Sequence, residues 1–121
     1  MKRQLSALDY IRFYNKVAER DLACQGCHQW PEERWKCINR SGGILDAHHL
    51  IPQQVLKREL PADQLKDALT DPRNGMLLGR YHHDRAESRM RTLIAPAAAW
   101  EFAAELGLTY ALERRCLREE P

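Results

Sequence analysis

Four of the five histidines in this chain occur as two adjacent pairs, His48-His49 and His82-His83. Imidazole binds first-row transition metals, and its ordinary pKa near neutrality lets it accept a proton at physiological pH. Asn74 lies between the two pairs, in a turn that also contains proline and glycine. The arrangement predicts a site that combines a metal ion with a general base. The alternative is that both pairs lie in ordinary surface loops.

The four cysteines indicate a second metal site. Cys24 and Cys27 have the spacing of a metal knuckle, and Gly26 between them favours a tight turn. A redox-active pair has the same spacing, but no thioredoxin-like strand-helix-strand pattern surrounds it. In a reducing cytoplasm an even number of cysteines does not imply disulfides. We therefore expect metal ligands here, and we expect Cys116, in a C-terminal helical pattern, to be a packing residue.

The length and composition of the chain limit the classes of protein to which it can belong. Its 121 residues correspond to one domain, so residues 1–121 are taken as a single unit. The net charge of +2 is too small to indicate a nucleic-acid partner by itself, although arginines gather around the second histidine pair. No apolar run approaches the roughly 20 residues of a membrane span, and the basic N-terminus lacks the apolar core of a signal peptide. We therefore expect a cytoplasmic protein.

Hydrophobic periodicity and turn residues predict a mostly helical α+β domain with two short strands near its centre. Helices are expected at 6–20, in two pieces of 53–70 divided by Pro61, at 80–91, and at 97–119 with a break at Gly107. Strands are expected at 43–49 and 76–78, and the aperiodic stretch 21–45 is expected to form loops and a short hairpin. The first histidine pair thus ends one strand, and the second pair opens the helix that follows the other strand.

The order of these parts resembles the HNH endonucleases, which are ββα-metal (His-Me finger) nucleases. The resemblance is carried by His48, His49, Asn74, Leu78, His82 and His83, together with the upstream knuckle of Cys24 and Cys27. It covers about residues 24–90 and leaves the terminal helices outside the core. It implies a ββα-metal core with flanking helices at both termini. It also implies metal-dependent hydrolysis of DNA phosphodiester bonds.

The resemblance also assigns roles to the histidines. His49 matches the general base of the family, and His48 and His83 match metal ligands. Adjacent residues of a regular strand point to opposite faces, although a kink before Pro52 could bring both side chains to one phosphate. An exchange of the two roles is the alternative. Asn74 matches the residue that braces the loop and orients the base, although an asparagine in a turn has the same appearance.

Two carboxylates and two arginines complete the expected active site. Glu87 lies four residues after His83, on the same helical face, where the family often has a second histidine. If Glu87 is a ligand, the site favours Mg²⁺ or Mn²⁺ over Ni²⁺ or Zn²⁺; the alternative is an ion pair with Arg91. Asp46 either orients a ligand or binds the metal directly. Positively charged candidates for holding the phosphate are Arg80 and Arg85.

The structural zinc site of the family is incomplete in this sequence. Relatives supply a second pair of cysteines in the Asn-to-His segment, where this chain has Gly79 and His82. Cys24, Cys27 and His82 then provide three ligands, with either Cys37 or His28 as the fourth. The alternative is that the site has been lost and the cysteines simply pack.

Two functions from different classes fit these residues. The first is a DNA endonuclease of the small stand-alone type found in phages and mobile elements, acting as a homodimer or within larger machinery. The second is a non-catalytic zinc-binding module that retains the fold and binds DNA or protein. An RNA-directed nuclease is a weaker third possibility, because no aromatic and basic RNA-binding signature is visible.

Overall fold

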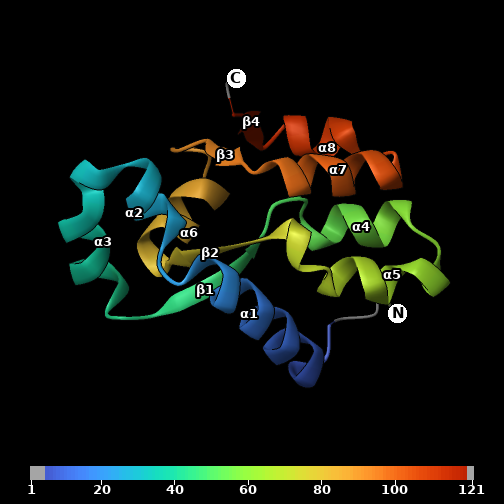
Figure 1. Cartoon of the computed structure of the whole chain (residues 1–121), viewed down its shortest axis with the longest axis horizontal. Coiled ribbons are helices and arrows are strands. Elements are labelled where there is room, and N and C mark those ends of the chain that lie inside the picture. The colour runs from blue at the N-terminus through green and yellow to red at the C-terminus, as the bar shows by residue number, and fades with distance from the viewer. Residues whose placement is uncertain (1–4, 120–121) are drawn as a thin grey trace.

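The computed structural model describes residues 5–119 of the chain. It has an α+β fold made mostly of helices, as the sequence predicts, with two small two-stranded sheets (Figure 1). In chain order the elements are α1 (Ala7–Asp21), α2 (Gln25–Gln29), the 3₁₀ helix η1 (Pro31–Glu33), α3 (Arg34–Ser41), β1 (Leu45–His49), α4 (Gln53–Glu59), α5 (Ala62–Thr70), the 3₁₀ helix η2 (Pro72–Asn74), β2 (Gly75–Gly79), α6 (Arg80–Glu87), β3 (Leu93–Ala95), α7 (Ala97–Leu106), α8 (Thr109–Glu113) and β4 (Cys116–Arg118). None of the helices in the described residues is long and apolar enough to cross a membrane.

The centre of the fold is the antiparallel hairpin of β1 and β2, followed directly by α6. The pairing is regular to the end of β1, where His49 lies opposite Gly75. Successive strand residues point to opposite faces, so His49 faces α1 and stacks on Phe13. Asp46 and His48 face α6 instead. The two faces of one short strand therefore direct adjacent histidines into different surroundings.

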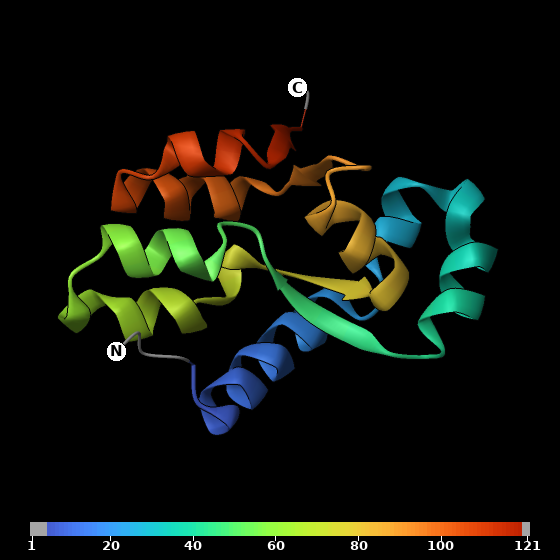
Figure 2. The same cartoon turned by 180° about the vertical axis from the view of Figure 1, so that it is seen from behind.

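Helix α1 covers one face of this hairpin, as Figure 2 also shows from behind. Ser6 caps its N-terminus by accepting a hydrogen bond from the backbone N–H of Asp9. The helix ends at Leu22, which has the left-handed φ of 65°. The buried side chains of Phe13 and Val17 pack against the hairpin and fix its position on the helix.

The segment between the two strands forms α4 and α5, divided at Pro61 as expected. The Asp71 side chain then caps η2 by accepting from the Arg73 backbone N–H. Gly75 follows η2 with a φ of −113°, so no left-handed backbone conformation requires a glycine there. The glycine is needed for space instead, because a Cβ there would lie 2.4 Å from Cγ2 of Val17.

The prediction of loop and hairpin for residues 21–45 is wrong. The stretch folds into α2, η1 and α3, and only its end enters β1. These helices are short, and their buried positions are small or polar residues such as Gly26, Cys37 and Ser41. They bury few large apolar side chains, so the sequence carries no clear helical periodicity.

The C-terminal half also differs from expectation in its boundaries. The helix expected at 80–91 ends at Glu87. Gly107 ends α7 with a φ of 70°, as predicted, but the last helix ends at Glu113. The chain then forms β4, which pairs in parallel with β3 and buries Cys116. β3 and β4 have only three residues each, which is too short for an alternation of apolar and polar residues to be recognised in the sequence.

Candidate metal centres

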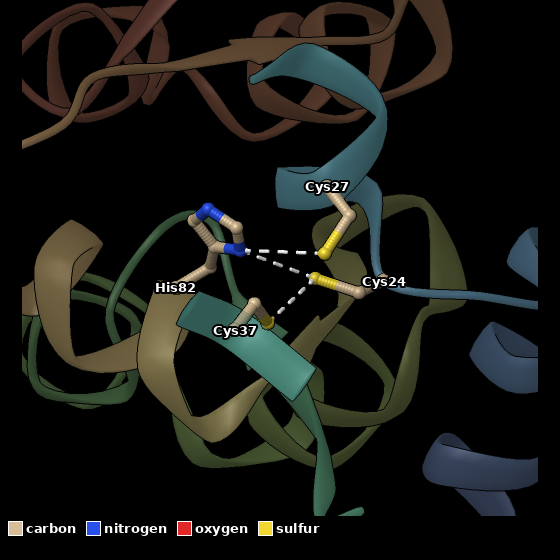
Figure 3. Close-up of side chains that lie close together, drawn as sticks. All are labelled: Cys24, Cys27, Cys37 and His82. Atoms are coloured by element: carbon tan, nitrogen blue, oxygen red, sulfur yellow. Dashed lines mark hydrogen bonds between the residues drawn. The ribbon is translucent and has the colours of Figure 1, made fainter. Parts of the chain in front are cut away.

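Three cysteines and one histidine form a buried group in which all four donor atoms lie within 4.8 Å of one another. The group joins α2, α3 and α6 and is made by Cys24, Cys27, Cys37 and His82 (Figure 3). The Sγ atoms of Cys24 and Cys37 are 3.9 Å apart, and Nδ1 of His82 is 3.5 Å from Sγ of Cys24. Tetrahedral zinc bonds imply ligand separations of about 3.8 Å between sulfurs and about 3.5 Å between sulfur and nitrogen. The four side chains therefore fit a metal ion such as zinc.

The structure distinguishes between the two candidates for the fourth ligand. Cys37 belongs to the group, whereas His28 does not. Gly79 explains how Cys37 reaches this position, because a Cβ on residue 79 would lie 2.6 Å from Sγ of Cys37. A side chain at position 79 and a ligand from Cys37 thus exclude one another. The absence of a side chain at Gly79 leaves the space that Cys37 occupies.

Gly26 has a different role from the expected one. Its φ is not positive, and it lies in α2 against the ring of His82. A Cβ at this position would be 2.3 Å from Cγ of His82. The glycine between the first two cysteines therefore makes room for the histidine ligand.

A buried carboxylate, which the sequence did not reveal, orients His82. The Nε2–H of His82 donates to Oε1 of Glu33 at 3.0 Å, which leaves the Nδ1 lone pair directed at the sulfurs. Arg91 holds the other oxygen of Glu33 with two hydrogen bonds, and this pairing lowers the pKa of Glu33. A carboxylate behind a ligating histidine is a common support of metal sites. Since 49 residues separate the partners in the chain, sequence spacing gave no signal for it.

The Cys27 thiol of this group needs a nearby cation to ionise. Burial, reinforced by hydrogen bonding to Cys37, raises the pKa of Cys27 above its ordinary value. A neutral pH alone therefore leaves this thiol protonated, whereas a divalent cation at the centre of the group favours the thiolate. The donor set and its burial are those of a structural metal site rather than an exposed redox pair.

The second group of donor atoms lies where α6 packs against β1. His48, His83 and Glu87 each place one ligand atom within 4.8 Å of the others. Oε1 of Glu87 is 3.5 Å from Nδ1 of His48 and 3.5 Å from Nε2 of His83. The expected alternative for Glu87, an ion pair with Arg91, does not form, because Arg91 pairs with Glu33.

Asp46 orients this second group from the side. The Nδ1–H of His83 donates to Oδ2 of Asp46 at 2.9 Å, so that Nε2 is left to face Glu87. Arg80 holds Asp46 with two hydrogen bonds of 2.8 and 3.2 Å. Asp46 itself lies outside the group of three donors. Its geometry is that of an orienting carboxylate, one of the two roles expected for it.

The electrostatics keep His48 neutral. Burial, with the proximity of the His83 and His49 imidazoles, lowers the pKa of His48 to about 3. A neutral imidazole is the form that binds a metal ion. Arg115 lies at the edge of the group, with its Nη1 3.9 Å from Oε2 of Glu87, and it was not among the residues expected there.

His49 lies outside this group, on the α1 face of the strand. Its ring stacks on Phe13 with centroids 4.4 Å apart, and its Nε2–H donates to the carbonyl of Leu69 at 2.9 Å. The unprotonated nitrogen is therefore Nδ1, which lies 3.4 Å from Nε2 of Gln53. Burial lowers the pKa of His49. No kink reorients the strand, because the pairing of β1 with β2 continues to His49.

Asn74 braces the loop that follows the first histidine pair. Its Oδ1 accepts from the Ile51 backbone N–H at 2.8 Å, and its Nδ2 donates to the Ile51 carbonyl at 3.1 Å. The Asn74 carbonyl also accepts from the backbone N–H of Leu50. The Asn74 side chain is only 1% exposed. Its hydrogen bonds satisfy the backbone groups of Ile51, which lies beyond the end of the β1–β2 pairing at His49.

The two expected phosphate ligands lie in different places. Arg80 is at the outer side of Asp46, next to the group that contains His83. Arg85 instead places its guanidinium over the ring of Tyr81 at 5.1 Å, on the side of α6 that carries His82. Of the two, only Arg80 borders the second group of donor atoms.

No family model matches the chain, and neither does any curated protein or solved structure. Function is therefore inferred from the chemistry of the two groups. One is a Cys₃His group that fits a metal such as zinc, and the other is a more exposed His₂Glu group.

Proposed function

We propose that this protein is a metal-dependent endonuclease that hydrolyses DNA, with a ββα-metal core formed by β1, β2 and α6. The observation that carries the proposal is the convergence of His48, His83 and Glu87 at the junction of β1 and α6. Asp46 supports it by accepting a hydrogen bond from His83, and Asn74 supports it by bracing the loop that follows β1. The strand–strand–helix order agrees with the resemblance noted in the sequence.

The donor set determines which metal fits. Two imidazoles with one carboxylate suit several divalent ions, and the hard oxygen of Glu87 favours Mg²⁺ or Mn²⁺ over Ni²⁺ or Zn²⁺. When bound, such an ion would polarise a phosphate oxygen and stabilise the departing alkoxide. Arg115 and Arg80 add positive charge at the border of the group, where a phosphate must approach.

His49 is the general base in this proposal. The Leu69 carbonyl fixes the tautomer by accepting from Nε2–H, so Nδ1 carries the lone pair that takes a proton from water. Burial keeps the ring neutral and therefore able to accept that proton. In this structure the Gln53 amide donates to Nδ1 at 3.4 Å, and the attacking water would take the place of that amide.

A second function is favoured by the Cys₃His group. Its four donors lie within 4.8 Å of one another, close to the spacing of zinc ligands. The site also joins α6 to α2 and α3, which bury few large apolar side chains of their own. A zinc-binding module that binds DNA or protein without cleaving it would need this group and no other. In the nuclease proposal the same zinc is structural and adds folding free energy.

Plasmid cleavage tests the proposal. Zinc-loaded wild type, His49→Ala, His83→Ala and Glu87→Gln are each incubated with supercoiled plasmid and EDTA, Mg²⁺, Mn²⁺, Ni²⁺ or Zn²⁺. We expect Mg²⁺- or Mn²⁺-dependent nicking by the wild type, lost in the first two variants, with a metal ranking altered in Glu87→Gln. His28→Ala is the matched control, because this histidine lies outside both groups. Equal nicking by every variant would assign the activity to a contaminant, and DNA binding without any cleavage would favour the zinc-binding module.

A further inference from the structure

Helix α3 stands at the edge of the molecule and exposes nearly all of its side chains. In Figure 1 it lies at the left, far from α4, α5, α7 and α8. Only Cys37 and Ser41 are buried along it, and both contact the α6 region. Trp35 is 74% exposed and Ile38 is 52% exposed. The helix is thus held by a narrow stripe of small side chains, while its outer face is unpartnered.

The exposed face of α3 is positively charged. Arg34, Lys36 and Arg40 are all exposed, and the helix contains no acidic residue. Within residues 5–119, none of these three cations forms a salt bridge. This differs from most arginines near the histidine groups, since Arg80 and Arg91 are each paired with a carboxylate. Three unpaired cations on one short helix match a polyanion.

The positions of these residues around the helix fit a groove. At about 100° per residue, Trp35 and Asn39 lie on the ridge opposite the buried stripe. Arg34 lies on one flank of this ridge, and Lys36 and Arg40 lie on the other. A helix entering the major groove of a DNA duplex directs its ridge at the base edges and its flanks at the two phosphate backbones.

We propose that α3 is a DNA-contacting helix that enters the major groove of a duplex, with Trp35 and Asn39 towards the bases and its flanking cations on the phosphates. The proposal rests on the proposed nuclease function and names the surface that holds its substrate. The Cys₃His group gives this surface its rigidity, because Cys37 ties α3 to His82 on α6, the helix that also carries His83. DNA held by α3 is thereby held in a fixed position relative to the second donor group.

The test is DNA binding measured separately from cleavage. A fluorescein-labelled duplex of about 24 base pairs is titrated with zinc-loaded protein in buffer without added Mg²⁺ or Mn²⁺, and fluorescence anisotropy gives the affinity at several salt concentrations. The test variant is Lys36→Gln/Arg40→Gln. The matched control is Arg12→Gln/Lys16→Gln, which removes the same charge at the same spacing from exposed positions of α1.

We expect the α3 double variant to weaken binding about 10-fold and to reduce the salt slope by about 1.8, for two lost phosphate contacts. The α1 control should leave both values unchanged. DNA should also quench tryptophan emission in the wild type but not in Trp35→Phe. If both double variants weaken binding equally, the loss of affinity comes from net charge alone and the proposal is overturned. Failure of the wild type to bind the duplex would also overturn it.

The outcomes separate this inference from the proposed function. Binding that depends on α3 without plasmid cleavage under any metal would leave the inference standing and refute the nuclease. Cleavage with α3 variants that bind normally would refute the inference and leave the nuclease in place.

Discussion

Replacing Asn74 with alanine should destabilise the protein substantially, because this side chain satisfies two backbone groups of a fully buried residue. Its amide accepts from the Ile51 N–H at 2.8 Å and donates to the Ile51 carbonyl at 3.1 Å. Each hydrogen bond contributes about 1 kcal/mol, and each buried backbone group left without a partner costs about 1–3 kcal/mol. Allowing for local relaxation, we expect the free energy of unfolding to fall by about 3 kcal/mol in Asn74→Ala.

Urea denaturation followed by circular dichroism measures this change. Asn74→Asp keeps an acceptor for the Ile51 N–H but places a second oxygen against the Ile51 carbonyl, so it should destabilise as well. Asn15→Ala, at an exposed position of α1, is the matched control and should be neutral or slightly stabilising. A loss below about 0.5 kcal/mol in Asn74→Ala would refute the bracing role, since a change of that size is typical of surface positions.

Three further predictions concern the Cys₃His group and the C-terminal strand. Gly79→Ala should lower zinc affinity at least about 10-fold in a competition with a chelating dye, because its Cβ would lie 2.6 Å from Sγ of Cys37; unchanged affinity would contradict the assignment of Cys37 as a ligand. Glu33→Gln should lower zinc affinity about 10- to 100-fold while circular dichroism of the zinc-loaded protein stays the same, and an equal affinity would show that the carboxylate does not position His82. Burial raises the pKa of Cys116 from 9.0 to about 12, so between these two pH values the native state keeps a thiol proton that the unfolded chain loses. The contribution of the protonated thiol to the free energy of unfolding is therefore complete below pH 9 and is lost as the pH rises towards 12. The free energy of unfolding of wild type relative to Cys116→Ala should therefore fall between pH 8 and pH 10, and a constant difference would contradict it.

The sequence was most informative where chemistry restricts the residue type. The histidine pairs, Asn74 and Glu87 were selected because few residues bind metals or satisfy a buried backbone, and the structure brings His48, His83 and Glu87 together. The main helices could also be predicted, since α1, α5 and α7 bury apolar faces with helical spacing.

The remaining features depend on contacts between distant parts of the chain. The choice of Cys37 over His28 follows from the space beside Gly79, and the role of Glu33 follows from a contact across 49 residues. The region 21–45 could not be read because α2 and α3 are held by sulfur and small side chains rather than by an apolar stripe. A pattern of hydrophobic residues cannot reveal helices that depend on a metal group for their packing.

The separation of His48 from His49 shows how a regular strand divides two adjacent residues. The sequence left open a kink that would bring them together, but the pairing with β2 continues to the end of β1. His49 consequently contacts Phe13 and the Leu69 carbonyl, whereas His48 contacts the α6 side chains.

The central claim is that the group of His48, His83 and Glu87 holds the metal ion that hydrolysis requires. It is tested most directly by measuring Mn²⁺ binding by electron paramagnetic resonance to zinc-loaded wild type and His83→Ala, and then plasmid nicking in the same samples. We predict one Mn²⁺ bound per chain in addition to zinc, absent from His83→Ala, with the nicking rate rising in proportion to Mn²⁺ occupancy. Nicking that does not follow occupancy, or a wild type that binds zinc but no Mn²⁺, would contradict the account.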